Sequence, residues 1–271
     1  MVIETVEIST PVEESPTVSW AAVAAGAIAA AALTLVLLAF GAGMGFSAVS
    51  PWGNSGVSAS TFEIGTGVYL IVVAMLASTI GGYIAGRLRI RWVDVHTHEV
   101  FFRDTAHGFL AWGLATVLSA AFLAAAASNI AGSASAVQSA GSSGPEDYYA
   151  DALLRPSAAA SPNTSDSKTI RREIARILTT GLRNRDIPAP DRTYLAQVVA
   201  ARTGLSQADA DKRVSDVLTQ AKTDLDNTRR AAAKLSLWLT ASLLIGAFCA
   251  SLAATEGGYV RDNWNPGVTG R

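Results

Sequence analysis

Four long runs without a charged residue alternate with polar segments along the chain. The runs cover residues 20–46, 64–86, 108–130 and 235–255. A helix needs about 20 residues to cross roughly 30 Å of hydrocarbon, and each run reaches that length. The pattern therefore predicts four transmembrane helices in an all-α, polytopic membrane protein, with the first three spans inside residues 19–134.

The polar stretch between the third and fourth runs has an amphipathic pattern. Apolar residues recur every three or four positions after Ser167 and again after Ser206, which is typical of helices with one buried face. No helix breaker lies between Ser206 and Gly246, so the last amphipathic helix should continue into the fourth run. We expect a small extramembrane helical domain over residues 135–234, inserted before the fourth membrane helix.

Three segments predict irregular structure. Residues 1–18 carry four glutamates, two prolines and no basic residue, which indicates a disordered tail. Residues 131–144 are mostly small and should form a linker after the third run. Residues 256–271 are expected to be a C-terminal tail.

The segment 87–107 predicts the orientation, because it holds four arginines and all three histidines between two apolar runs. Short basic loops stay in the cytoplasm. We therefore expect cytoplasmic termini and a periplasmic segment 131–234. Three basic residues before the fourth run favour the opposite side, but long domains cross largely regardless of charge. A re-entrant third helix would make the domain cytoplasmic. The three basic residues are Arg229, Arg230 and Lys234.

Two small-xxx-small pairs, Gly41 with Gly45 and Gly82 with Gly86, are the candidate helix-packing residues. Such pairs allow helix backbones to approach closely in lipid. A functional break that lines a pore is the alternative for the first pair.

The short polar sequence around His96 and His98 could supply metal ligands, with Glu99 or Asp94 as the third. No second cluster completes such a site, so a solvated connector is the favoured interpretation, and no cofactor is expected. Asp104 should lie near the N-terminus of the third helix, where a negative charge is favourable to the helix dipole.

Charge and cysteine content narrow the picture further. Residues 145–234 hold 15 basic and 12 acidic residues, so no strong field favours nucleic acid. The single cysteine, Cys249, lies in the fourth run, which excludes an intramolecular disulfide.

Two short echoes suggest that the second pair of membrane helices repeats the first. The sequence Gly-Gly-Tyr-Ile at 81–84 recurs as Gly-Gly-Tyr-Val at 257–260, and Ser-Ala-Val at 47–49 recurs at 135–137. Two duplicated hairpins are therefore one possible architecture, although small residues are common here and chance matches are frequent.

Four stretches carry a resemblance to a known family: SWAAVAAGAIAA (19–30), IGGYIAGRLRIRW (80–92), FRDTAHGFLAW (102–112) and YLAQVVAARTGLSQADADKRV (194–214). Through them the chain resembles a family of uncharacterised inner-membrane proteins of alphaproteobacteria, some of which are labelled PhnA-like. The resemblance implies a bacterial inner membrane and no catalytic residue. Nothing in these stretches supports phosphonate chemistry.

Among function classes, an enzyme is the least favoured, because no nucleophile–base set or carboxylate pair converges in the sequence. The absence of ionisable residues from the four runs also disfavours an ion-coupled transporter. We expect a non-catalytic structural or accessory subunit whose helical domain docks other membrane proteins or a second copy. The alternative is a passive channel or transporter for small solutes, lined by glycine and serine faces. No small-molecule substrate is identifiable.

Overall fold

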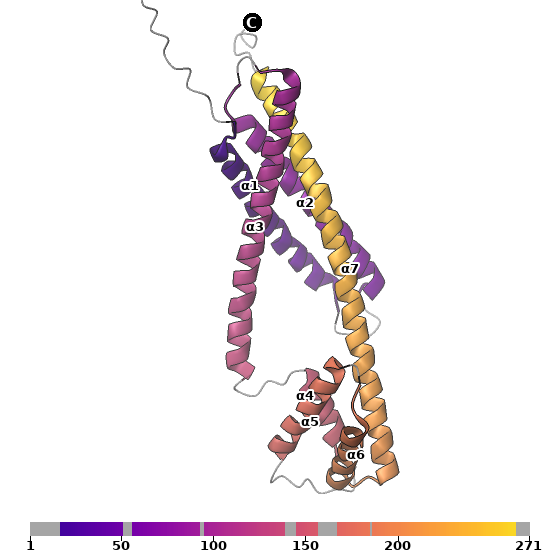
Figure 1. The fold of residues 1–271 in the computed structure, drawn as a ribbon. Helices are drawn as coiled ribbons and strands as arrows, with labels where there is room; N and C mark the ends of the chain where they lie inside the picture. Colours follow the sequence, from indigo (N-terminus) through magenta and orange to yellow (C-terminus); the bar gives the residue numbers. More distant parts are fainter. Residues whose placement is uncertain are drawn as a thin grey trace, which may run out of the picture. The chain divides into compact units, whose positions relative to one another are not determined.

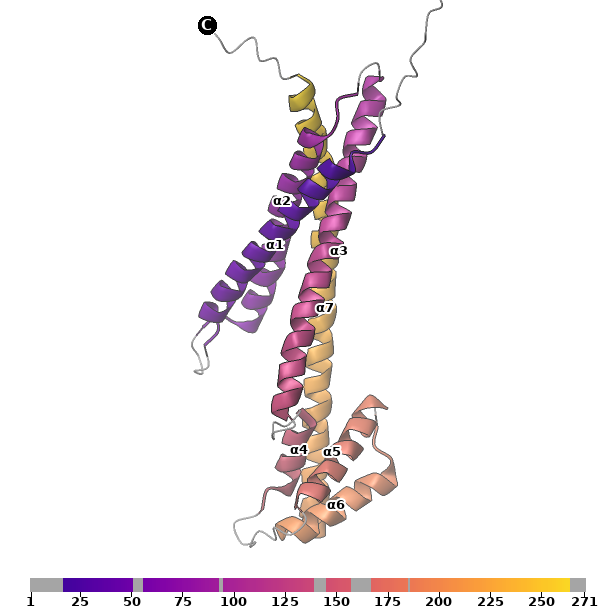
Figure 2. The same ribbon diagram turned by 90° about the vertical axis from the view of Figure 1, so that its left-hand side faces the viewer.

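The fold is described from a computed structural model, drawn as ribbons in Figures 1 and 2. The structure describes residues 17–50, 56–92, 95–138, 145–156, 167–184 and 186–263. The tail predicted for residues 1–18 lies outside this set except for its last two residues.

The described residues are helical apart from short connections. No β-strand occurs among them, and one isolated bridge joins Val49 to Gly56. The helices are α1 (Trp20–Ala48), α2 (Ala59–Leu88), α3 (Thr97–Gln138), α4 (Pro145–Leu154), α5 (Ser167–Arg183), α6 (Ala189–Thr203) and α7 (Gln207–Asp262).

Four of these helices, α1, α2, α3 and α7, are long and apolar enough to cross a membrane. This finding confirms the all-α prediction with four membrane helices. The chain divides into two compact units: unit 1 comprises residues up to 126 together with 235–271, and unit 2 comprises residues 127–234. Helices α3 and α7 contribute to both units.

Helix α3 is longer than the predicted third span, and it corrects the prediction for the segments on either side of that span. It covers Thr97–Gln138 rather than 108–130, so half of the basic segment and much of the expected linker are helical. On the N-terminal side, Glu99 and Arg103 form an ion pair one turn apart, with 2.7 Å between Oε1 and Nε. On the C-terminal side, alanine is the best helix former and no proline intervenes.

The ends of the other membrane helices also differ from the predicted spans. Helix α2 begins at Ala59 rather than at residue 64, because the Ser58 hydroxyl caps it by accepting a hydrogen bond from the Thr61 amide at 3.1 Å. Helix α7 continues to Asp262, so the first part of the predicted C-terminal tail is helical. These two predicted boundaries fall at a charged residue, whereas a helix ends where its backbone groups find caps. The two kinds of boundary therefore need not coincide.

Close backbone contacts made possible by small residues hold unit 1 together. A Cβ atom on Gly81 would lie under 3.0 Å from Gly26 in α1, and one on Gly82 would lie under 3.0 Å from Ala250 in α7. These contacts exist only because glycine has no side chain. Adjacent glycines thus let α2 contact two helices at once. Helix α3 packs on α1 through Ala115, which joins a cluster of three alanines.

Unit 2 has a hydrophobic core of its own. Helices α4, α5, α6 and the first part of α7 each bury one apolar face in it, as the amphipathic spacing requires. The connections are defined by caps: Gly204 ends α6 in the left-handed conformation at φ +73°, and the Ser206 hydroxyl accepts from the Asp209 amide at 3.1 Å. The core contains Tyr149, Ala150, Leu153, Ile174, Ala175, Leu178, Ile187, Leu195, Ala196, Val199, Ala210, Val214, Leu218 and Ala221.

Replacing Leu178 tests whether this core stabilises unit 2. Its side chain is fully buried, so Leu178→Ala should lower the free energy of local unfolding by about 2–5 kcal/mol. Leu225→Ala, at a residue that is 42% exposed, should have a much smaller effect. Hydrogen exchange of the α5, α6 and α7 amides in detergent-solubilised protein measures both. Equal protection in the two variants would contradict the assigned core.

A second test uses the hydrogen bond from the Tyr149 hydroxyl to Asp224 Oδ2, 2.7 Å long. Burial, together with this bond, raises the pKa of Tyr149 to about 12. The same bond, with a second from Gln220, lowers the pKa of Asp224. A lowered carboxyl pKa contributes stability at neutral pH that is lost as the pH falls through that pKa.

Tyr149→Phe should therefore destabilise unit 2 at pH 7, and the difference from the unmodified protein should narrow below about pH 4. Hydrogen exchange at the two pH values measures this change. Tyr148→Phe is the matched control, because the adjacent ring is 63% exposed. A difference that stays constant from pH 7 to pH 3 would show that the Asp224 charge is not involved.

Candidate functional site: a buried ion-pair network in unit 1

The strongest polar feature of unit 1 is a buried pair between Arg89 and Asp104. Arg89 follows the last residue of α2, and Asp104 lies in the third turn of α3. The guanidinium donates from Nε to Oδ1 and from Nη2 to Oδ2, the second at 2.6 Å. The two side chains are 0% and 4% exposed. Such a two-point contact is the geometry in which a buried pair best offsets its desolvation.

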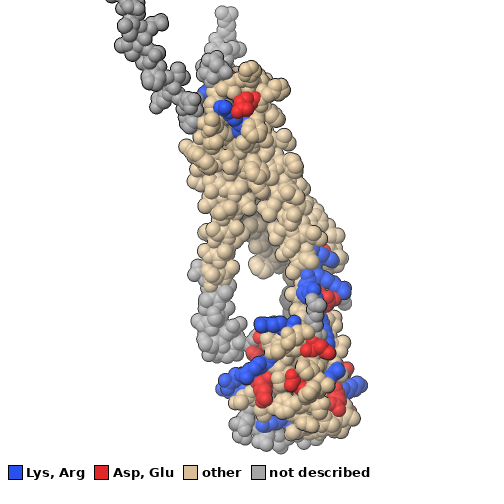
Figure 3. All heavy atoms as spheres, in the orientation of Figure 1, with Lys and Arg blue, Asp and Glu red and all other residues tan. Residues whose placement is uncertain are grey.

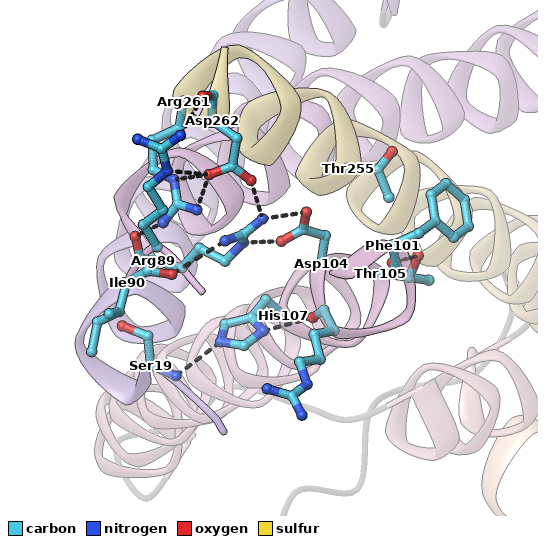
Figure 4. Close-up of polar contacts among 12 residues, drawn as sticks. Ser19, Arg89, Ile90, Phe101, Asp104, Thr105, His107, Thr255, Arg261 and Asp262 are labelled. Atoms are coloured by element: carbon cyan, nitrogen blue, oxygen red, sulfur yellow. Dashed lines mark hydrogen bonds and ion pairs between the residues drawn. The ribbon is translucent and has the colours of Figure 1, made fainter. Parts of the chain in front are cut away.

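The end of α7 joins this pair (Figure 4). Arg89 Nη2 also donates to Asp262 Oδ2 at 3.1 Å, and Arg261 Nη1 donates to the backbone carbonyl of Arg89. Arg91, which is largely exposed, reaches the backbone carbonyl of Asp262 at 3.2 Å. The network therefore ties the C-terminal end of α7 to the connection between α2 and α3.

An aromatic layer lies directly against the network. The Arg89 guanidinium carbon is 4.1 Å from the centre of the Trp92 ring, and that of Arg103 is 5.3 Å away. Trp92 in turn meets the His107 ring edge to face, with 5.5 Å between ring centres. A cation over an indole face is attracted by the ring quadrupole, so the layer adds to the electrostatic stabilisation of both arginines.

His107 fastens the start of α1 to α3. Its Nε2 accepts a hydrogen bond from the Ser19 backbone amide at 2.8 Å, and its Nδ1 is 2.6 Å from the Arg103 carbonyl oxygen. An accepting Nε2 puts the proton on Nδ1, which then donates to that carbonyl. The imidazole is buried in this arrangement. Both of its nitrogens are used structurally.

Two glycines of α7 make room for the network. A Cβ atom on Gly258 would collide with the Asp104 carboxylate and approach Arg89 Nη2 within 2.9 Å. One on Gly257 would collide with the backbone carbonyl of Tyr83 in α2. The two adjacent glycines therefore let the same turn of α7 contact both α2 and the Arg89–Asp104 ion pair.

The sequence-predicted glycines have separate environments. Gly82 and Gly86 lie against the α7 backbone at Ala250 and Ala254, where no side chain would fit. Gly41 lies under the Tyr69 ring. Gly45 is more open, since the nearest atoms to its Cβ position belong to Phe62 at 3.7 Å. Helix α1 continues through both of its glycines, so neither breaks it.

The residues considered for metal binding do not form a cluster in the described part of the chain. The His96 carbonyl accepts the first amides of α3, His98 is exposed in the first turn, and Glu99 pairs with Arg103. No group of three or more His, Cys, Asp or Glu residues occurs within the described ranges. Asp94 lies outside those ranges.

Several residues of the network are not found by reading local motifs. Asp104 does not interact with the helix dipole as predicted, because α3 begins seven residues before it and the carboxylate pairs with Arg89. Asp262 falls in the segment predicted to be a C-terminal tail, and the sequence singles out Gly258 only as part of the echo. The available signal was topological: four crossings bring the 87–107 segment and the end of α7 to one end of the bundle.

The three buried side chains at the centre of this region, Arg89, Asp104 and His107, are bonded to one another or to the backbone at every polar position. Arg89 uses Nε, Nη1 and Nη2 as donors, with Nη1 bonded to the Ile90 carbonyl at 3.2 Å. Both oxygens of Asp104 accept from Arg89, and both nitrogens of His107 are bonded. A general acid or base must reach the proton that it transfers, and these groups are buried against one another. The arrangement can fasten helices together.

Comparison with protein-family models, curated proteins and solved structures gives no match for this chain. The role of the network therefore rests on its geometry.

Breaking the buried pair should loosen unit 1. Arg89→Leu leaves the Asp104 carboxylate buried without its partner, which costs about 3–5 kcal/mol. The double variant Arg89→Leu/Asp104→Leu should recover part of this loss because no uncompensated charge remains. Arg91→Leu is the control, since that side chain is 67% exposed. Thermal unfolding in detergent compares the four proteins. If Arg89→Leu were as stable as Arg91→Leu, the buried pair would not stabilise unit 1.

Proposed function

We propose that the chain is a non-catalytic integral protein of a bacterial inner membrane, acting as a structural or accessory subunit. Unit 1 is its membrane anchor, and unit 2 docks another membrane protein or a second copy. The observation that carries this proposal is the saturation of the Arg89, Asp104 and His107 side chains by one another and by the backbone. Polar side chains that are bonded in this way hold the helices together and cannot also contact a substrate.

The surface of each unit agrees with these roles. On the face of unit 1 drawn in Figure 3, charged side chains are almost confined to the end that holds the network, as a lipid-facing surface requires. Unit 2 carries charges of both signs over a buried apolar core. On α5, the exposed face is basic and includes Lys168, Arg172 and Arg176. A folded, charged helical surface of this kind is suited to recognising a protein partner.

Passive permeation is less well supported. The glycine faces that would line a path at Gly82 and Gly86 are filled by the backbone of α7. Gly41 is covered by the ring of Tyr69, whose hydroxyl donates to the Leu37 carbonyl at 2.5 Å. Close contacts at these positions favour packing over a route for solutes.

For orientation, we propose that the network end of unit 1 faces the cytoplasm. The Arg89 network joins residues from the start of α1, the α2–α3 connection and the end of α7, so all three share one end. The short basic segment there favours the cytoplasmic side. Since α3 is continuous over Thr97–Gln138, a re-entrant third helix is disfavoured. Unit 2 is then periplasmic, despite the basic residues before the fourth span.

Membership of the alphaproteobacterial family and the duplication of two hairpins remain proposals of the same kind. The echo aligns Gly81 with Gly257 and Gly82 with Gly258. The first glycine of each pair lies against the backbone of a neighbouring helix, Gly81 against Gly26 in α1 and Gly257 against Tyr83 in α2. The second glycines differ, because Gly82 lies against Ala250 in α7 and Gly258 lies against the Asp104 and Arg89 side chains. Support for the duplication therefore comes from the sequence echo and the first glycine of each pair.

Cysteine labelling tests the orientation. Thr180 is exposed on α5, so Thr180→Cys in a Cys249→Ser background provides one accessible thiol. An impermeant thiol reagent should label it in cells whose outer membrane is permeabilised and whose inner membrane is intact. A cysteine at His98, exposed in the first turn of α3, should be labelled only after lysis. The reverse pattern would put unit 2 in the cytoplasm.

Photocrosslinking and a flux assay together test the docking role. A photoreactive residue at Arg172 or Arg176 should give discrete products of higher mass in intact membranes, either a dimer or a complex with another protein. The same residue at Ala196, which is 0% exposed in the core, should give none. Purified protein in liposomes should not release trapped small solutes. Solute release without any crosslinked product would replace the accessory role by the channel alternative.

A further inference from the structure

An apolar cavity of about 690 Å³ lies between α1 and α2, at the end of unit 1 where the hairpin loop joins them. The C-terminal part of α1 and the N-terminal part of α2 form its walls. The aromatic rings of Phe46, Phe62 and Tyr69 line it together with aliphatic side chains. No charged residue lines the cavity, so its wall is suited to contact with a hydrocarbon chain.

Glycine keeps the cavity open. Gly45 and Gly65 line it from the two helices, and a Cβ atom on Gly65 would meet nothing within 4 Å. At Gly45 the nearest atoms are 3.7 Å away, which is ordinary contact distance. Gly41 forms the inner end, where the Tyr69 ring lies on it and the tyrosine hydroxyl is bonded to the Leu37 carbonyl. A side chain would fit at Gly45 and at Gly65, where it would occupy part of the cavity.

A rim of hydroxyl groups stands beside the apolar wall. Ser58 Oγ is 3.1 Å from Ser60 Oγ and 2.8 Å from Thr61 Oγ1, and Thr61 also lines the cavity. The rim is held in place because Val57 donates from its amide to the Ala48 carbonyl at 3.2 Å. The cavity therefore has an apolar interior and a polar, uncharged border on a fixed part of the hairpin.

We propose that this cavity is a binding site for one acyl chain of a glycerophospholipid. Both walls belong to helices that are long and apolar enough to cross the membrane, so the medium around the cavity is lipid. The cavity is open toward its surroundings, and Phe46 in its lining is 83% exposed, so an acyl chain can enter it from the lipid and make dispersion contacts with the wall. The ester region of a phospholipid lies at the border of the hydrocarbon layer. The bonds among the Ser58, Ser60 and Thr61 hydroxyls use two of their three protons, and the remaining proton can be donated to an ester carbonyl oxygen.

The proposal concerns unit 1 alone and holds whether or not unit 2 docks a partner. It also explains why glycine occurs at 45 and 65, where no close contact between helices requires it. At Gly82 and Gly86 a neighbouring backbone fills the space that a side chain would take, whereas at Gly45 and Gly65 that space belongs to the cavity.

Filling the cavity from either side tests the proposal. Gly45→Leu and Gly65→Leu each place an aliphatic side chain inside it, one from α1 and one from α2. Gly43→Leu is the matched control, because Gly43 is on α1, has nothing within 4 Å of its Cβ position and does not line the cavity. Full-length proteins are washed free of lipid in detergent, and dioleoyl phosphatidylethanolamine is added back. Native mass spectrometry then measures the fraction that carries one lipid.

The bound fraction should fall roughly tenfold in the two cavity variants and stay unchanged in Gly43→Leu. Equal binding by all four proteins, or an equal loss in all three variants, would overturn the site. Helix content and the thermal midpoint in detergent show whether a variant is folded. If one cavity variant does not fold, the other still decides, since they enter from different helices.

A photoreactive leucine analogue at Leu70, which also lines the cavity, identifies the occupant in native membranes. A crosslinked product with the mass of a phospholipid, joined through its acyl chain, supports the proposal. A product formed with a quinone, or with a second copy of the chain, would overturn it.

Discussion

The ion pair between Arg89 and Asp104 is the interaction on which the arrangement of unit 1 depends. Burying either charge alone would cost several kcal/mol, so the fold is stable only where the two meet with good geometry. That requirement fixes the end of α2 against the third turn of α3. Asp262 then brings the end of α7 to the same place, and His107 brings the start of α1. The ion pairs thus join three helix segments, and the His107 hydrogen bond adds the start of α1.

Small residues supply the remaining stability of unit 1, for a reason specific to membranes. Lipid tails are as apolar as leucine, so helices gain little from burying apolar surface and depend on close van der Waals contact. The glycines at 81, 82, 86 and 257 provide that contact by letting backbones approach. Gly258, next to Gly257, instead admits the carboxylate of Asp104 to the surface of α7. Packing and electrostatics are therefore coupled in one helix.

Unit 2 follows different physical rules, although α7 contributes to both units. In water the hydrophobic effect drives its helices together, so its core is built of leucine, isoleucine, valine and alanine rather than glycine. The same helix changes character along its length, from an amphipathic face with Val214 and Leu218 to an apolar segment with Ala250 and Ala254. An unbroken helix of this kind joins an anchor that relies on close packing to a domain that relies on burial.

The sequence by itself determined the features that depend on local composition. Charge-free runs of sufficient length specify four membrane helices, and the lack of a breaker specifies the continuity of α7. The four-residue spacing of Ile174 and Leu178 in α5, and of Leu195 and Val199 in α6, specifies buried faces. Only the tertiary structure decided which distant groups meet. Arg89 and Asp262 are 173 residues apart, and no local pattern pairs them. The helix ends and the cavity could not be predicted from the sequence either, because each depends on which neighbouring residue caps a helix or fills a space.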